Sequence, residues 1–223
     1  MTTLVLLSGG LDSAVLAAHE AQSARVLPVY VSVGLAWERA EREVVARLLA
    51  SDAVGSGVRP LASLTVDMTD VYPAEHWAIQ GRPPAFDTPD EDVYLHGRNI
   101  VLLGKAGVYC AAARIERLVL GTLDRNPFPD STPAFRSAMA STLSLGLAHA
   151  LQIDAPFARV SKAEVIRRGV AVGIPFELTL SCMNPVGTRH CGACSKCRER
   201  HEAFLEAKVT DPTDYVDRRH VSA

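Results

Sequence analysis

The feature that most constrains this chain is a glycine-rich string near its N-terminus. A short apolar run, residues 3–7, leads into Ser-Gly-Gly-Leu-Asp-Ser, and an alanine-rich stretch without glycine or proline continues to about residue 22. The apolar run predicts a buried strand and the stretch after it a helix. Two glycines permit a tight turn whose amides approach an anion, and a helix N-terminus favours negative charge. The string predicts a phosphate-binding loop made of Leu7, Ser8, Gly9, Gly10, Leu11, Asp12 and Ser13.

Asp12 is unusual in a site for anions. A magnesium ion that bridges its carboxylate to phosphates would account for it, and so would capping of the helix. The alternative for the whole string is an ordinary capped turn. Its position between a strand and a helix favours the phosphate loop.

Strand and helix patterns alternate along the rest of the chain. We expect strands at 26–33, 59–66 and 117–121, and helices at 13–22, 37–50, 100–115, 134–150 and 161–172. Pro28 suggests that its strand starts nearby or lies at an edge of the sheet. The alternation predicts the α/β class, a parallel sheet with helices on both faces, with ligands bound beyond the carboxyl ends of its strands. The long irregular stretch 67–93 predicts a functional or mobile loop.

Four of the five cysteines cluster near the C-terminus. Cys182, Cys191, Cys194 and Cys197 have the spacing to surround one tetrahedral ion, and an all-sulfur set without an open position is typical of structural zinc. An iron–sulfur cluster or redox-active thiols are the alternatives. His190 adjoins a ligand; we expect a neighbour of the site, the alternatives being that it replaces a cysteine as ligand or hydrogen-bonds to one. Cys110 lies in an apolar stretch and is expected in the core.

Composition limits the remaining classes. The 223 residues carry a formal net charge of −2, which provides no broad basic field for stable nucleic-acid binding. No signal peptide or membrane helix is apparent, so we expect a cytoplasmic protein that does not bind membranes. We expect residues 1–175 to form the ATP-binding α/β domain and residues 176–223 a zinc-binding appendage packed on it.

The motifs together resemble a known family. The Ser-Gly-Gly-Leu-Asp-Ser string resembles the PP-loop ATP pyrophosphatases, which have the adenine nucleotide alpha-hydrolase-like fold and cleave ATP between its α and β phosphates. Residues 93–99, 161–166 and 177–200 resemble, in order, three segments of 7-cyano-7-deazaguanine synthase. That resemblance covers almost the whole chain.

The resemblance implies an ATP-dependent carbon–nitrogen ligase of the queuosine pathway, with magnesium accompanying ATP. Its substrates would be ATP, ammonia and 7-carboxy-7-deazaguanine, and two adenylations would give first an amide and then the nitrile. It implies catalytic roles for Asp12, Arg98 and Lys162 and contacts of Arg98, Asn99 and Asp130 with the 7-deazapurine. A surface salt bridge for Arg98 and a solvated Lys162 are the alternatives. A homodimer is also implied.

Two segments depart from the family pattern. Residues 33–37 read Val-Gly-Leu-Ala-Trp where the family usually has Tyr-Gly-Gln-Arg-His, and Ser131 in 122–132 replaces the usual cysteine. Both departures fall in the expected substrate pocket and not in the ATP loop. A paralogue that adenylates another carboxylate or stops at an amide is therefore an alternative. A tRNA-modifying PP-loop enzyme and a non-catalytic nucleotide sensor are the others.

Overall fold

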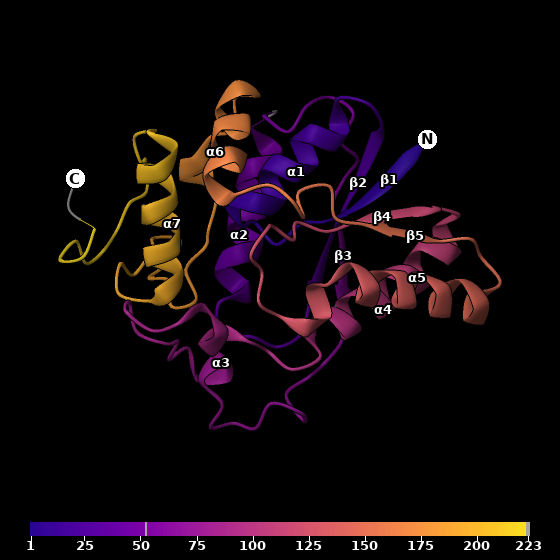
Figure 1. The fold of residues 1–223 in the computed structure, drawn as a ribbon, viewed down its shortest axis with the longest axis horizontal. Coiled ribbons are helices and arrows are strands. Elements are labelled where there is room, and N and C mark those ends of the chain that lie inside the picture. Colours follow the sequence, from indigo (N-terminus) through magenta and orange to yellow (C-terminus); the bar gives the residue numbers. More distant parts are fainter. Residues whose placement is uncertain (52, 222–223) are drawn as a thin grey trace.

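A five-stranded parallel sheet forms the centre of the molecule. The computed structural model describes residues 1–51 and 53–221 (Figure 1). The strands are β1 (Thr2–Leu6), β2 (Arg25–Ser32), β3 (Ala62–Thr65), β4 (Arg117–Val119) and β5 (Gln152–Asp154). Their order is β3-β2-β1-β4-β5, and each neighbouring pair is parallel. The predicted α/β class with a parallel sheet is confirmed.

Successive residues of β1 supply the two cores of the sheet. Val5 and Leu7 belong to one buried cluster, whereas Leu4 and Leu6 belong to the cluster on the opposite face. This is the alternation that a strand imposes on its side chains. Because both faces are covered, the strand reads as a continuous apolar run.

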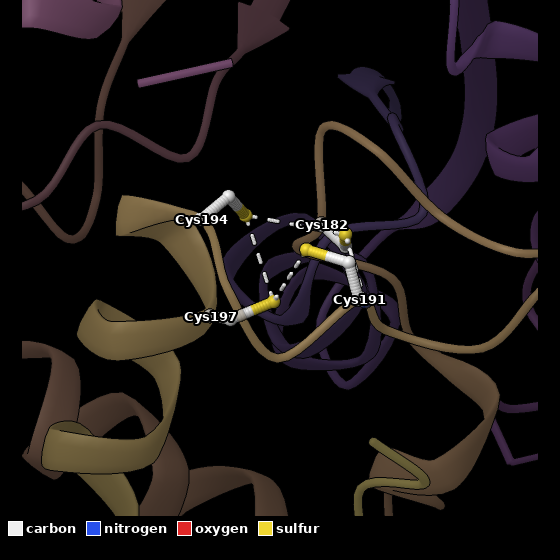
Figure 2. Close-up of side chains that lie close together, drawn as sticks. All are labelled: Cys182, Cys191, Cys194 and Cys197. Atoms are coloured by element: carbon white, nitrogen blue, oxygen red, sulfur yellow. Dashed lines mark hydrogen bonds between the residues drawn. The ribbon is translucent and has the colours of Figure 1, made fainter. Parts of the chain in front are cut away.

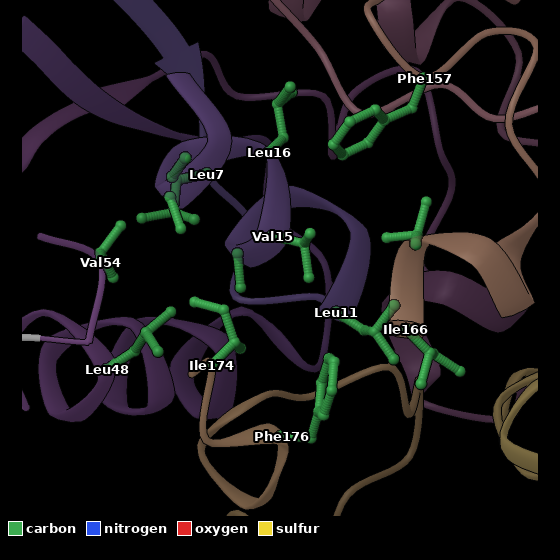
Figure 3. Packing of buried hydrophobic residues seen from close by; sticks show 14 of the residues in the cluster. Leu7, Leu11, Val15, Leu16, Leu48, Val54, Phe157, Ile166, Ile174 and Phe176 are labelled. Carbon is green, nitrogen blue, oxygen red and sulfur yellow. The ribbon is translucent and has the colours of Figure 1, made fainter. Parts of the chain in front are cut away.

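Helices cover both faces, as predicted. The longer ones are α1 (Leu11–Ala21), α2 (Glu38–Ala50), α4 (Arg98–Ala113), α5 (Pro133–Leu147), α6 (Lys162–Ala171) and α7 (Ser195–Ala207). Helices α1, α2, α6 and α7 share the cluster that contains Leu11, Leu48, Ile166 and Phe176 (Figure 3). Helices α4 and α5 pack on the other face, where Cys110 is fully buried as expected. Helix α6 begins after Ser161, whose hydroxyl accepts a bond from the Glu164 amide and caps the helix expected there.

The expectation from Pro28 was wrong. Pro28 is the fourth residue of β2, and β2 lies between β3 and β1. The missing amide is tolerated because it faces the β3 side, where pairing is interrupted between the Val26–Val58 bridge and the Val29–Ala62 pair.

Several short elements were missed. Strand β5 has three residues, and the stretch 67–93 contains the one-turn helix α3 (Trp77–Gln80) and the 3₁₀ turn Asp90–Val93. Two further 3₁₀ turns are Pro129–Ser131 and Phe176–Leu178. Helix α7 packs along α6 and places Phe204 in the same core as Leu11. Across 1–51 and 53–221, no helix is long and apolar enough to cross a membrane.

Candidate active site and metal centre

The phosphate loop has the predicted position between β1 and α1. Gly9 adopts a φ of 82°, and a side chain there would meet the Glu41 carbonyl at 3.2 Å and Val45 at 3.0 Å. Only glycine meets both constraints. The Ser13 hydroxyl donates to the Gly10 carbonyl (2.9 Å), and the Gly10 amide donates to the Ser8 hydroxyl (3.3 Å). The loop therefore holds its shape through its own side chains.

Asp12 is the polar centre of the loop. Its Oδ1 is buried and has no hydrogen-bond partner among the described residues, while its Oδ2 lies 3.4 Å from the Lys162 ammonium. Burial raises the pKa of Asp12, and the charge of Lys162 opposes that rise. A buried carboxylate oxygen without a partner fits the ligand of a hard cation such as Mg²⁺.

Lys162 and Lys196 share one carboxylate. Glu199 accepts from Lys162 at 2.6 Å and from Lys196 at 2.7 Å. Burial raises the pKa of Glu199, but the two ammonium groups outweigh burial and hold that pKa well below its usual range. Asp12 and Glu199 in turn keep the pKa of Lys162 above its usual range, despite burial. The site thus contains two fixed cations beside the phosphate loop.

A cavity of about 310 Å³ opens beside this loop, within the size range of ligand pockets. It lies beyond the carboxyl ends of β1, β2 and β4, where the strand order reverses direction. Of the predicted residues, Leu7, Ser8, Gly10, Asp12, Ser13, Arg98, Asn99 and Asp130 line it. Gly9, Leu11 and Lys162 do not line it, because Gly9 packs against α2, Leu11 against the core, and Lys162 against Asp12 and Glu199.

Arg98, Asn99 and Asp130 meet at one wall of the cavity. Asp130 accepts from the Asn99 amide (3.1 Å) and from the Asn99 side chain (3.2 Å), so it caps helix α4, whose N-cap Gly97 has no side chain. Arg98 Nε is buried and has no hydrogen-bond partner within the described ranges. This wall therefore offers one unpaired donor, Arg98 Nε, together with the carboxylate of Asp130, which Asn99 holds in place.

A second acidic group was missed in the sequence. Glu41 of α2 lines the same cavity and accepts from the Tyr30 hydroxyl at 2.7 Å. Burial raises its pKa to about 7, opposed by the positive charge of Arg98. The nearby Glu38 binds the backbone instead: its carboxylate accepts from the amides of Val33 (2.7 Å) and Gly34 (3.1 Å). The charged pattern of residues 37–50 predicts a helix, but it does not predict which acidic side chain of that helix faces the cavity.

Aromatic rings line the cavity at both departures from the family pattern. Trp37 stacks on Trp77 with ring centroids 5.8 Å apart, and Phe128 stacks on Tyr94 at 5.1 Å. Ser131, in place of a cysteine, is buried and bonds within its own turn to Asn126 and the Phe128 carbonyl, 2.7 Å each. The site therefore presents an aromatic ring at residue 37 and a turn held by hydrogen bonds at residue 131.

The four predicted cysteines converge. Figure 2 shows their side chains pointing toward one another, and all four sulfurs lie within 4.8 Å of each other. Measured Sγ–Sγ distances are 4.0 Å for Cys182–Cys194, 3.8 Å for Cys191–Cys197 and 3.6 Å for Cys194–Cys197. Zn–S bonds of about 2.3 Å at tetrahedral angles place sulfurs about 3.8 Å apart, so the set fits a tetrahedral metal. His190 Nε2 accepts from the Ser181 amide at 3.1 Å, which makes His190 a neighbour of the cluster.

The cysteine segment contacts the active site on two sides. The Leu180 amide donates to the Gly9 carbonyl (2.8 Å), and Lys196, between two of the cysteines, lines the cavity. The Ser195 amide donates to the Pro84 carbonyl (3.2 Å), and Arg198 donates to the carbonyls of residues 86 and 88. A bound metal would therefore stabilise both the phosphate loop and the stretch 67–93.

Comparison with known proteins agrees with this geometry. Residues 2–208 match a family model described as "Queuosine biosynthesis protein QueC". The chain belongs to the QueC family. It is 34% identical to proteins named 7-cyano-7-deazaguanine synthase from Anaeromyxobacter dehalogenans, with 96% of this chain and 95% of the relative covered, and from Methanopyrus kandleri, with 97% and 99% covered.

Among solved structures, a predicted subunit of tRNA methyltransferase from Methanocaldococcus jannaschii is 17% identical with a TM-score of 0.49. The match covers 76% of this chain and 74% of that one. A likeness this weak has no bearing on function.

Proposed function

We propose that this protein is an ATP-dependent ligase that converts 7-carboxy-7-deazaguanine and ammonia into 7-cyano-7-deazaguanine, with AMP and pyrophosphate as the other products. One observation carries the proposal. The phosphate loop and the wall formed by Arg98, Asn99 and Asp130 line a single cavity, so ATP and a small carboxylate would meet there. Membership of the QueC family supports the choice of substrate.

The phosphate loop would hold the departing pyrophosphate. Backbone amides at the start of α1 and the hydroxyls of Ser8 and Ser13 provide donors, while Lys162 and Lys196 provide positive charge. Asp12 would hold the magnesium that accompanies ATP, and that ion would neutralise phosphate charge as the α–β bond breaks. The loop's part in catalysis is to position and stabilise the leaving group.

Arg98 would bind the substrate carboxylate. Its buried guanidinium has a donor without a partner, and a carboxylate matches the planar fork of arginine. Trp37, Tyr94 and Phe128 would pack on the flat 7-deazapurine, and the remaining lone pairs of Asp130 would accept from its amino edge. Asn99 would act by holding Asp130.

We propose that the cysteine cluster holds structural zinc. Four thiolates leave no open position for water, so the ion would supply fold stability and no chemistry. The proposal treats residues 1–175 as the ATP-binding domain and 176–223 as a zinc-binding segment packed on it. It places the reaction in the cytoplasm, where ATP is available. A homodimer remains a prediction.

The test is incubation with Mg-ATP, ammonium and 7-carboxy-7-deazaguanine, with pyrophosphate and product mass read together. The nitrile with AMP and pyrophosphate is the expected result, and Asp12→Ala should abolish pyrophosphate release. Amide alone would mean that the altered pocket stops after one adenylation. ATP binding with no product and no pyrophosphate would refute the proposal and leave a nucleotide sensor.

A further inference from the structure

Glu41 is a buried carboxylate that no part of the adenylation step uses. It is 7% exposed, lines the cavity, and lies on the helix whose backbone contacts Gly9 of the phosphate loop. The Tyr30 hydroxyl donates to its Oε2 at 2.7 Å. Its backbone carbonyl lies against Gly9 of the phosphate loop, and the charge of Arg98 acts on its carboxylate.

The proposed reaction has a proton to remove. At neutral pH nearly all ammonia is present as ammonium, which has no lone pair with which to attack carbon. An enzyme that uses it needs a base within reach of the nitrogen, and a base acts best when its pKa lies near the working pH. The described cavity wall offers three carboxylates, those of Asp12, Glu41 and Asp130.

Two of these carboxylates are already engaged. Asp12 of the phosphate loop pairs with Lys162 of α6, and both oxygens of Asp130 accept from Asn99. The side-chain donor to Glu41 is the uncharged Tyr30 hydroxyl, so its carboxylate is not tied up in a hydrogen bond with a cation.

We infer that Glu41 binds ammonium in the cavity and accepts its proton, which delivers ammonia to the adenylated carboxyl carbon. The inference rests on the proposed function and assigns a residue to the handling of ammonia in that reaction. One N–H bond of ammonium breaks and its proton moves to the Glu41 carboxylate. The freed lone pair forms the C–N bond, and the C–O bond to AMP breaks with its electron pair leaving on the phosphate oxygen. A second proton leaves the nitrogen for solvent as the amide forms.

The charges around Glu41 set the pH at which it acts. Arg98 of α4 faces it and lowers its pKa, while Glu38 of the same helix raises it. The Tyr30 hydroxyl of β2 lowers it through its hydrogen bond, and burial, the largest effect, brings it to about 7. Below that pH the carboxyl group is protonated and cannot accept. Ammonium-dependent turnover should therefore fall as the pH drops through about 7.

The experiment compares two nucleophiles in wild type, Glu41→Gln and Glu43→Gln. Hydroxylamine is uncharged at neutral pH and traps an acyl-adenylate as a hydroxamate without needing a base. Glu41→Gln should lose about 10²-fold or more of its ammonium-dependent amide formation and keep its hydroxamate formation. Glu43 is exposed on the same helix, so Glu43→Gln should match wild type with both nucleophiles. Tyr30→Phe should move the midpoint of the ammonium pH profile upward, because it removes a bond that favours the carboxylate.

The outcomes separate the two proposals. Wild type that forms no hydroxamate would overturn the proposed function and the role of Glu41 with it. Normal hydroxamate formation in wild type, with Glu41→Gln losing both products equally, would make Glu41 a structural partner of Tyr30 and overturn only the inference. Unchanged amide formation in Glu41→Gln would also overturn it.

Discussion

Replacing Gly192 by alanine tests how tightly the metal-binding segment is built. Gly192 adopts a φ of 78°, and a Cβ at this position would lie 1.8 Å from the Asp217 carbonyl oxygen. That oxygen cannot move alone, because the Val216 amide donates to the His190 carbonyl (2.8 Å) and the Asp217 amide donates to the Cys191 carbonyl (3.0 Å). Accommodation requires the C-terminal stretch to move away from the cysteines.

Two contributions set the size of the effect. A left-handed conformation costs alanine about 1–2 kcal/mol. Separating the C-terminal stretch loses two hydrogen bonds, each worth about 1 kcal/mol. The sum is about 3–4 kcal/mol, which corresponds to a fall in Tm of about 10 °C in a chain of this size.

Gly187→Ala is the matched control. Gly187 has a φ of 62° in the same segment, but a Cβ there meets nothing within 4 Å. It should therefore show only the conformational cost, about 1–2 kcal/mol and roughly 5 °C. Thermal unfolding of both metal-loaded variants, with metal content measured on the same samples, gives the comparison. Equal shifts in Tm would refute the argument, because they would mean that the contact with Asp217 costs nothing.

Three further changes have expected outcomes. Gly169→Ala would place a Cβ 2.4 Å from the Phe176 ring and should lower the free energy of unfolding, measured by urea denaturation, by about 1–3 kcal/mol. Gly104→Ala is the control: its Cβ would meet nothing within 4 Å, so the free energy of unfolding should stay unchanged or rise. The lowered pKa of Glu199 means that its ion pairs stabilise the fold fully above about pH 4.3 and lose that effect as the pH falls further. The difference in unfolding free energy between wild type and Glu199→Gln should therefore shrink in acid. A difference that stays constant with pH would contradict this argument. Removal of metal with a chelator should lower Tm. It should also weaken ATP binding measured by calorimetry, because the Leu180 amide of the cysteine segment donates to Gly9 of the phosphate loop. Unchanged ATP affinity would exclude this link between the metal site and the loop.

Features with a local signal were predictable from the sequence. The first strand, the glycine-rich turn after it and the helix start near Ser161 each depend on residues within a few positions of one another, and the structure has all three. The cysteine cluster was predictable because metal ligands recur at short spacings. Helix ends differed by at most three residues, as for α5, which ends at Leu147 and not at 150.

Features that depend on distant contacts were not predictable. The three residues of β5 have no periodicity, and only pairing with β4 makes them a strand. Glu38 and Glu41 look alike in the sequence, yet one binds backbone amides and the other faces the cavity. Asn99 and Asp130 were both expected to bind substrate, and their bond to each other joins residues 31 positions apart. Such roles follow from the fold and not from any short motif.

The bond between the Leu180 amide and the Gly9 carbonyl also has a consequence for biosynthesis. A ribosome makes the phosphate loop before the cysteine segment, because residues 7–13 precede residues 180–197 in the chain. The loop therefore lacks one of its supports until Leu180 has been translated, and the cavity lacks Lys196 until that residue has been translated. Chains that terminate early, before residue 180, carry the nucleotide motif without the residues that complete its site. Such fragments should hydrolyse little ATP.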